Sequence, residues 1–334
     1  MNQEKMEAPL TAPEIAALWS QYMNDSLSKC VLLSFLGSCR DGRIREVLQF
    51  ALMLSERHLE KGGGFLLNEN YPLPVGFQEE DNKSAPPLFS ESFMLFYIYI
   101  MSIHGMTRYA GAIGIIIRED QRRYFMECCN ETMELYNKSI TVLADIGLIS
   151  RPPTLHNRHE VEFIKKESYM ENLFSGDRPL NVIEISGMYL NLQKTDLKAV
   201  LETGFGQTAQ SKEVKAFMKR AKKLCEKHFD LLASILRDNE LPAPRNYSAE
   251  VTDSTSPPFS DKLMLYHTAM LLSSAIGYFG EALSVSQRKD LSSCYTRMIA
   301  EIALLAEDGM ELLIRKGWME QPPSAADRKG LLDD

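Results

Sequence analysis

The residues that could carry chemistry in this sequence are a few histidines and carboxylates in segments with helical periodicity. His58 and His228 each end a matching tripeptide, Glu-Arg-His and Glu-Lys-His. A di-iron site in a four-helix bundle needs a Glu from two helices and a Glu-x-x-His pair from the other two, because positions i and i+3 face the core together. Three residues before these histidines stand Ser55 and Cys225, not glutamates. The sequence therefore predicts no standard di-iron centre.

A mononuclear metal site can still be drawn in the first half of the chain. If the first two helices run antiparallel about a short connection, Asp25 lies level with His58. The remaining helices would bring His104 and either Glu131 or Glu134 to a similar height. Two imidazoles with one or two carboxylates would suit iron, manganese or zinc. The candidate metal ligands are therefore His58, His104, Asp25 and Glu134.

The second half lacks part of this set, because Thr195 replaces Asp25 and Leu304 replaces Glu134. A metal site would thus be confined to the first half. The alternative interpretation of each histidine is a core imidazole bonded to a backbone group or a carboxylate. The leading expectation is no cofactor and no catalytic residue, with iron, manganese or zinc as the alternative.

Other residue patterns favour packing over chemistry. The six cysteines form no Cys-x-x-Cys pair and no Cys/His cluster at zinc spacing, which indicates buried free thiols. The basic stretch from Lys215 to Lys227 is typical of a solvated helix face. The 17 methionines and the aromatic residues of Phe89 to Tyr99 are typical of a core, although they could also line a pocket for an apolar ligand.

An internal repeat defines the elements that position these residues. A single offset of 170 residues aligns the chain with itself from end to end, without a gap. A long period that occurs twice indicates a duplicated domain rather than a solenoid. The offset pairs, among others, Glu14 with Glu184, Pro72 and Pro74 with Pro242 and Pro244, Phe89 and Ser90 with Phe259 and Ser260, and Gly147 with Gly317.

Each copy is expected to form four long helices. The first helix opens with a capping box, Thr11-Ala-Pro-Glu14, and the second copy opens in the same way with Asn181 and Glu184. Pro-rich stretches at 71–88 and 241–258 make the link between the second and third helices of each copy long. This connectivity is that of ferritin-like bundles. The predicted fold class is all-α, a tandem duplication of a ferritin-like four-helix bundle with a long crossover between helices two and three.

The predicted domains are the first bundle at 8–153, a linker with a short helix at 154–179, the second bundle at 180–323 and a C-terminal tail at 324–334. The expected linker helix is the amphipathic stretch from His159 to Phe174.

Three glycines, Gly62 to Gly64, interrupt the second helix and have no counterpart in the second copy. Each glycine costs on the order of 1 kcal/mol relative to alanine in a helix. We therefore expect the end of that helix to fray or bend.

Composition narrows the function classes. A net charge of −8 and a pI near 5.4 argue against nucleic-acid binding, which needs clustered Lys and Arg. No apolar run approaches the roughly 20 residues of a membrane span, and the start of the chain lacks the pattern of a signal peptide. The expected location is the cytoplasm.

Four strings resemble a known family: Leu-Trp-Ser-Gln-Tyr-Met-Asn-Asp at 18–25, Tyr-Pro-Leu-Pro-Val-Gly-Phe at 71–77, Glu-Val-Thr-Asp-Ser-Thr-Ser-Pro-Pro-Phe-Ser-Asp-Lys-Leu-Met at 250–264 and Gly-Trp-Met-Glu-Gln-Pro-Pro at 317–323. The chain resembles a two-copy family of spore-forming Gram-positive bacteria that is known as a domain of unknown function, number 3231. The resemblance implies a ferritin-like fold and a spore or stress setting, since some members are named coat-F-type spore-coat proteins by similarity. It implies no catalytic residues.

The leading functional hypothesis is a non-catalytic ferritin-like protein with a structural or interaction role, associated with sporulation or stress. Protein partners or self-association would then be expected. The alternatives are a metal-binding protein or metal-dependent oxidase with its site in the first bundle, and a carrier of an apolar ligand.

Overall fold

The computed structural model describes residues 8–156, 160–171 and 178–328. Within these ranges the chain forms eight α-helices and three 3-10 helices, and no strand beyond two isolated bridges. The first half contains α1 (Ala12–Ser38), α2 (Gly42–Asn68), η1 (Glu79–Asp81), α3 (Glu91–Ile113) and α4 (Glu119–Asp145), and the second contains α5 (Val182–Thr208), α6 (Lys212–Asp238), η3 (Ser248–Glu250), α7 (Asp261–Val285) and α8 (Lys289–Arg315), with η2 (Glu167–Tyr169) between them.

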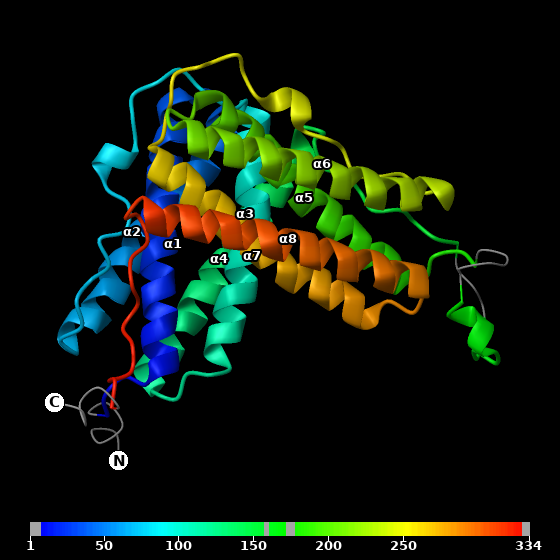
Figure 1. Cartoon of the computed structure of the whole chain (residues 1–334), viewed down its shortest axis with the longest axis horizontal. Helices are drawn as coiled ribbons and strands as arrows, with labels where there is room; N and C mark the ends of the chain where they lie inside the picture. Colours follow the sequence, from blue (N-terminus) through cyan, green and yellow to red (C-terminus); the bar gives the residue numbers. More distant parts are fainter. Residues whose placement is uncertain (1–7, 157–159, 172–177, 329–334) are drawn as a thin grey trace.

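Each half is a four-helix bundle with short, long and short connections, as predicted. The helices of each half form two antiparallel hairpins, and a long crossover returns along the bundle before the second hairpin starts (Figure 1). The crossover makes the second and third helices of each half run in the same direction, which is the ferritin-like connectivity. A relationship to ferritins stays a prediction, as do the bounds of the domains.

The first helices begin where their caps predict. The Oε2 atom of Glu14 accepts the Thr11 amide at 2.7 Å, and Glu184 accepts the Asn181 amide at 3.1 Å. The other carboxylate oxygen of Glu14 accepts the Arg118 amide at 2.8 Å at the start of α4. A single glutamate thus satisfies exposed amides of two helices, so its role is structural in both copies.

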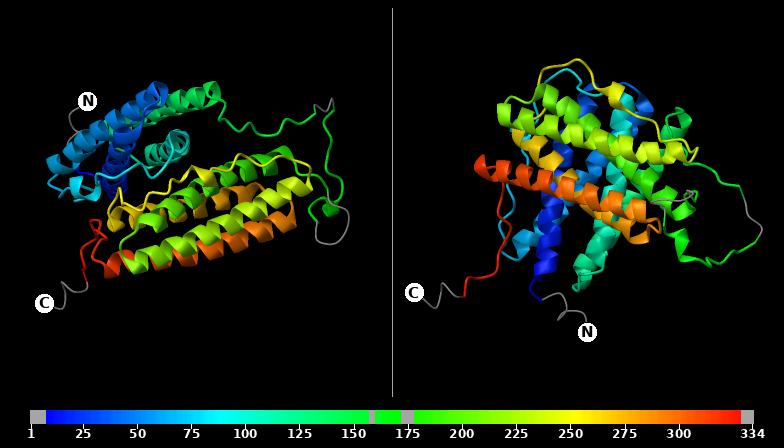
Figure 2. Two further views of the ribbon diagram at one scale, coloured as in Figure 1. Left: turned by 90° about the horizontal axis from the view of Figure 1, so that it is seen from above. Right: turned by 45° about the vertical axis from the view of Figure 1, so that its right-hand side comes forward.

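The two bundles share the larger of two hydrophobic clusters, the smaller lies within the first bundle, and the bundles form two stacked layers (Figure 2). The cap serines of α3 and α7 bond across the boundary, because Ser90 donates to Glu250 at 2.6 Å and Ser260 donates to Asp81. Near the centre of the interface, the Tyr97 hydroxyl lies 3.3 Å from Nε2 of His267, its counterpart in the repeat.

The expected fraying at the glycines of α2 was wrong, and a bend there stays a prediction. The helix continues through them to Asn68, because Gly62 and Gly63 are buried against neighbouring helices. A Cβ at Gly62 would lie 3.3 Å from both Gln21 Oε1 and the Tyr124 hydroxyl, so the missing side chain permits a close approach.

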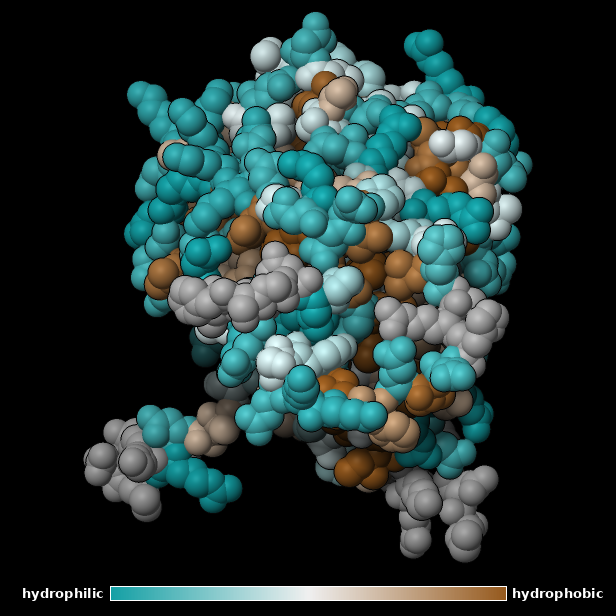
Figure 3. Space-filling model, turned by 90° about the vertical axis from the view of Figure 1, so that its right-hand side faces the viewer, coloured by the Kyte–Doolittle hydropathy of each residue, from teal (hydrophilic) through white to brown (hydrophobic). Residues whose placement is uncertain are grey.

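The predicted linker helix was also wrong for the described residues. Of the stretch His159 to Phe174, residues 160–171 hold one 3-10 turn, and the remainder lies outside the described residues. Val161 and Phe163 are more than 80% exposed, at 88% and 82%. With no partner surface for this apolar stripe, the cost of helix nucleation is not offset. Elsewhere on that side of the molecule, apolar atoms form separate patches among polar ones (Figure 3).

Candidate functional site

A cavity of about 510 Å³ lies inside the first bundle and is partly open to solvent. Most of the side chains around it are apolar or small, with a polar cluster at one side. Helix α7 of the second bundle closes part of it with His267, Met270, Leu271 and Ser274.

Short side chains on α1 explain why the cavity is found in this half. Ser20, Asn24 and Ser28 occur at intervals of four residues, so they share one face of α1, and all three line the cavity. Their counterparts in the repeat are Leu190, Lys194 and Lys198, which have much longer side chains. The second bundle therefore fills the space that the first leaves open.

The polar cluster is centred on His58, which is 3% exposed. Its Nε2 atom lies 3.2 Å from Glu131 on α4, and its Nδ1 atom lies 3.5 Å from Asp25 on α1. The hydroxyl of Tyr109 on α3 is 3.3 Å from the same Nδ1 atom. Side chains from all four helices of the bundle thus meet at one imidazole.

A second set of hydrogen bonds supports the cluster. Gln21 donates to the Tyr109 hydroxyl at 3.3 Å and accepts from the Tyr124 hydroxyl at 2.9 Å. Tyr124 also lies 3.2 Å from the carbonyl oxygen of His58. These contacts fix the orientation of Tyr109, the tyrosine that lines the cavity.

The surroundings of His58 favour the protonated, positively charged form of its imidazole. Burial by itself would lower the pKa of His58, but the hydrogen bond and the charge of Asp25, together with the neighbouring Cys128, outweigh it and raise that pKa to about 10. Glu131 is held by Arg57 as well, at 2.6 Å, which keeps a carboxylate beside the ring. Both N–H groups of the imidazolium face carboxylates, those of Asp25 and Glu131, so the neighbouring Tyr109 phenol is the donor that remains for the cavity.

The structure brings together two of the four predicted ligands, Asp25 and His58. Glu134 is exposed and paired with Lys138 on its own helix, so the carboxylate of α4 that meets His58 is Glu131. This was the other option that the spacing allowed. One helical turn on the surface of α4 separates the two glutamates, and helical phase alone could not choose between them.

His104 lines the cavity away from the His58 cluster, and its ring packs edge-on against Tyr278 of α7 at 5.0 Å. Burial lowers the pKa of His104 well below its usual value, and the nearby Lys194 and Lys198 lower it further. Its neighbours are therefore cationic and aromatic groups rather than ligand carboxylates.

The arrangement around His58 differs from that of a metal site. Asp25 and Glu131 lie at opposite nitrogens of one ring, so the imidazole stands between them and cannot share one ion with both. Within residues 8–156, 160–171 and 178–328, no group of three or more His, Cys, Asp or Glu side chains is placed to hold a metal ion.

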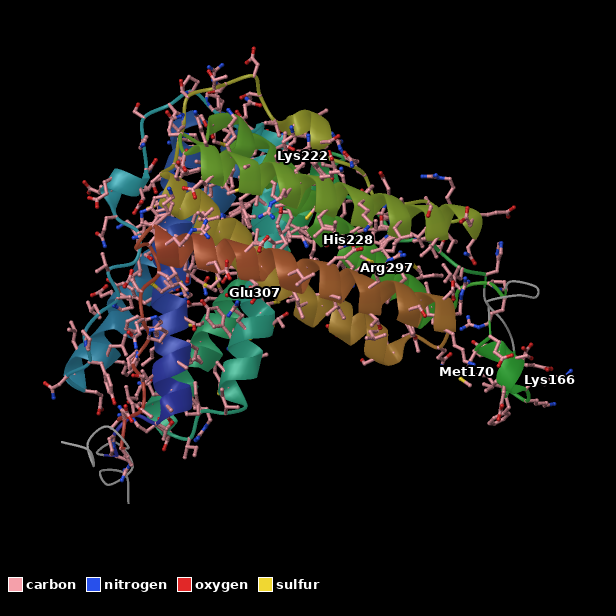
Figure 4. All side chains as sticks on the ribbon, viewed as in Figure 1. Lys166, Met170, Lys222, His228, Arg297 and Glu307 are labelled. Carbon is pink, nitrogen blue, oxygen red and sulfur yellow. The ribbon has the colours of Figure 1, made fainter. Side chains whose placement is uncertain are left out.

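The second bundle repeats only half of the cluster. His228 lies 2.8 Å from Glu301, which also pairs with Lys227 at 2.6 Å, and Figure 4 shows His228 between α6 and α8. Phe279 and Thr195 replace Tyr109 and Asp25. The His–Glu contact is thus a packing feature common to both copies, whereas Asp25 and Tyr109 are specific to the cavity.

Sequence reasoning missed Tyr109 and the buried lysines Lys194 and Lys198. The alignment of the two copies contained a signal for each. Tyr109 stands where the second copy has Phe279, and Lys194 and Lys198 stand where the first copy has Asn24 and Ser28, on a helix face that should be buried. Positions at which the copies differ in polarity therefore mark where the two interiors differ in structure.

The fold and the site define a duplicated helical-bundle protein with a cavity in one of its two bundles. The chain belongs to the family described as Protein of unknown function (DUF3231), whose profile matches residues 1–161 and again residues 168–331. The resemblance to this family is therefore confirmed. No curated protein matches the chain.

Among solved structures, the chain is similar to a protein of Bacillus halodurans that is provisionally named a spore coat protein. The two are 17% identical, the TM-score is 0.40, and the match covers 45% of this chain and 98% of the other. None of the helices in the described ranges is long and apolar enough to cross a membrane.

Proposed function

We propose that this protein binds a small, mainly apolar molecule in the cavity of its first bundle. The observation that carries the proposal is the cavity itself. Its volume of about 510 Å³ falls within the range of roughly 300 to 1,000 Å³ that is usual for ligand sites. Of the three hypotheses from the sequence, the apolar-ligand carrier is the one that this observation favours.

The polar cluster suggests how such a ligand would be oriented. The Tyr109 hydroxyl, a donor on one side of the apolar cavity, would fix a ligand through an oxygen that accepts its hydrogen bond. An alcohol, ketone or ester with an aliphatic or aromatic body fits this description. The ring of His58 is held on both sides, so its role in this proposal is to position Tyr109 rather than to transfer a proton.

The second bundle acts as a support in this proposal. Its α7 helix contributes to the cavity wall, and its own interior is occupied by the longer side chains of α5. A spore or stress setting, with protein partners or self-association, stays a prediction from the family resemblance.

The proposal is tested by binding of N-phenyl-1-naphthylamine, a neutral apolar fluorophore. Ser20→Leu introduces the residue that the repeat has at Leu190 and fills part of the cavity. Ser293→Leu is the matched control, because Ser293 is exposed on α8. The wild type and the control should bind one fluorophore per chain, and Ser20→Leu should bind at least about tenfold more weakly, equal to about 1.4 kcal/mol.

The result that contradicts the proposal is equally specific. Either no saturable binding to the wild type, or equal binding by Ser20→Leu and the wild type, would show that the cavity is not a ligand site. Near-ultraviolet circular dichroism of both variants checks that the bundle itself is unchanged.

A further inference from the structure

Two lysines on α5, Lys194 and Lys198, lie inside the protein without a counter-ion in contact. Their residues are 4% and 3% exposed, and neither Nζ atom has a hydrogen-bond partner in the part of the chain that the structure describes. A buried charge without a partner is costly, so such groups are normally paired or neutral. Two of them one helical turn apart call for an explanation.

Both side chains line a small cavity between α5 and α7. Its volume of about 10 Å³ is close to what a single water-sized particle needs. The cavity is also lined by Thr195, whose hydroxyl is buried and has no hydrogen-bond partner among the described residues. Three residues whose polar groups can donate hydrogen bonds therefore line a space for one small particle.

The other walls of this small cavity supply no negative charge. They consist of Leu271, Ala275 and the aromatic residues Tyr278 and Phe279, together with Asn191 and His104. Asn191 already donates to the backbone carbonyls of Gly187 and Tyr278. The ring of Tyr278 lies against the Lys194 ammonium, with its centroid 2.8 Å from Nζ, and aromatic faces stabilise a cation only in part.

The nearest acidic groups do not neutralise the pair by contact. Glu281 attracts Lys194 and Glu202 interacts with Lys198 through the interior. Neither Nζ atom forms a hydrogen bond with these glutamates in the described ranges, and the Oε2 atom of Glu202 is itself buried without a partner there. Without another negative charge, burial lowers the pKa of Lys194 to about 6, and repulsion by Lys198 contributes to that shift.

We propose that Lys194, Lys198 and Thr195 form a binding site for one small monatomic anion of the chloride class. The ion would offset one of the two positive charges, accept hydrogen bonds from both ammonium groups and accept the hydrogen bond of the Thr195 hydroxyl. Larger anions are excluded by the volume, whereas the flexible lysine side chains allow for the somewhat larger radius of a halide. The site adjoins the large cavity through the shared residues His104 and Leu271 but does not depend on its ligand.

The corresponding site is absent from the first bundle for a reason visible in the sequence. Asn24 and Ser28 stand where Lys194 and Lys198 stand in the second copy. Only the second bundle therefore has the positive charge that an anion would neutralise, and the proposed site distinguishes the two copies.

Unfolding in sodium chloride and in sodium gluconate at equal ionic strength tests the proposal, because gluconate is too large to enter. At chloride concentrations ten times the dissociation constant, the folding equilibrium constant of the wild type should rise about elevenfold over its value in gluconate. Lys194→Met and Lys198→Met should lose this difference while remaining at least as stable as the wild type in gluconate. Lys223→Met, at an exposed position on α6, should keep it.

A crystal of the wild-type protein grown in sodium bromide provides a second measurement that needs no variant. Anomalous scattering from bromide between the two Nζ atoms would support the site. An anomalous map without a peak there, or equal stability of the wild type in chloride and gluconate, would overturn the proposal in favour of a bound water molecule.

Discussion

The charge state of His58 gives the sharpest quantitative prediction. Its pKa rises from 6.5 to about 10 in the folded protein, whereas the unfolded chain has the ordinary value. The folded state therefore binds the proton more tightly, and the resulting stabilisation is complete below pH 6.5 and is lost as the pH rises toward 10. At 1.36 kcal/mol per pH unit this amounts to about 5 kcal/mol at most. Burial raises the pKa of Asp25 and opposes the pairing, which reduces the expected net contribution to about 2 kcal/mol.

The substitution His58→Gln removes this proton-binding group and keeps much of the side-chain volume. It should reduce the free energy of unfolding by about 2 kcal/mol more at pH 6 than at pH 9.5, because the wild type has lost most of the contribution by then. Urea denaturation followed by circular dichroism at the two pH values measures both differences.

His228→Gln is the internal control with the opposite sign. Burial lowers the pKa of His228, with the charge of Lys198 adding to the effect and Glu301 opposing it. A lowered histidine pKa destabilises the folded state as the pH falls below 6.5, so this substitution should be relatively less harmful at pH 5.5 than at pH 8. Equal effects of His58→Gln at pH 6 and pH 9.5 would refute the assignment of an imidazolium to the first bundle.

Two further predictions concern buried positions. Gly62→Ala should destabilise the protein by about 1 kcal/mol, because the new Cβ would press on Gln21 and Tyr124. Gly64→Ala should stabilise the protein by about 0.5 to 1 kcal/mol, because the new Cβ meets nothing within 4 Å and alanine favours the helix. Melting temperatures that move in the same direction for both variants would contradict this contrast. Burial raises the pKa of the Glu202 carboxyl to about 8, so the folded state loses stability as the pH rises from 4.5 toward 8. Glu202→Gln should therefore be more stable than the wild type above pH 8, by about 1 to 2 kcal/mol. Urea denaturation at pH 5 and pH 8.5 tests this, and an equal difference at both values would count against it.

Much of the architecture follows from local rules that the sequence displays. Capping residues such as Thr11 and Asn181 mark helix starts, and Gly147 and Gly317 mark helix ends with φ values of 70° and 69°. The repeat doubles the evidence for each of these signals. The long crossover could be inferred because proline-rich segments interrupt helical periodicity twice at the same place.

The candidate site was predictable only in part. Asp25 and His58 could be placed together because two antiparallel helices joined by a short turn leave little freedom in their relative height. The choice between Glu131 and Glu134 depended on the rotation of α4 about its own axis, which packing against α2 decides. The position of His104 beside α7 could not be foreseen either, because it depends on how the two bundles pack against each other.

The sequence by itself determined that this protein is a duplicated set of four helices with a long crossover, because caps, breakers and periodicity act over a few residues. Only the tertiary structure decided that, among the described residues, the first bundle holds a large cavity and the second does not. The large cavity, the buried pair Lys194 and Lys198, and the contacts around His58 each involve side chains of several helices. The volume of the cavity and the charge states of the buried groups depend on packing distances that no local pattern encodes.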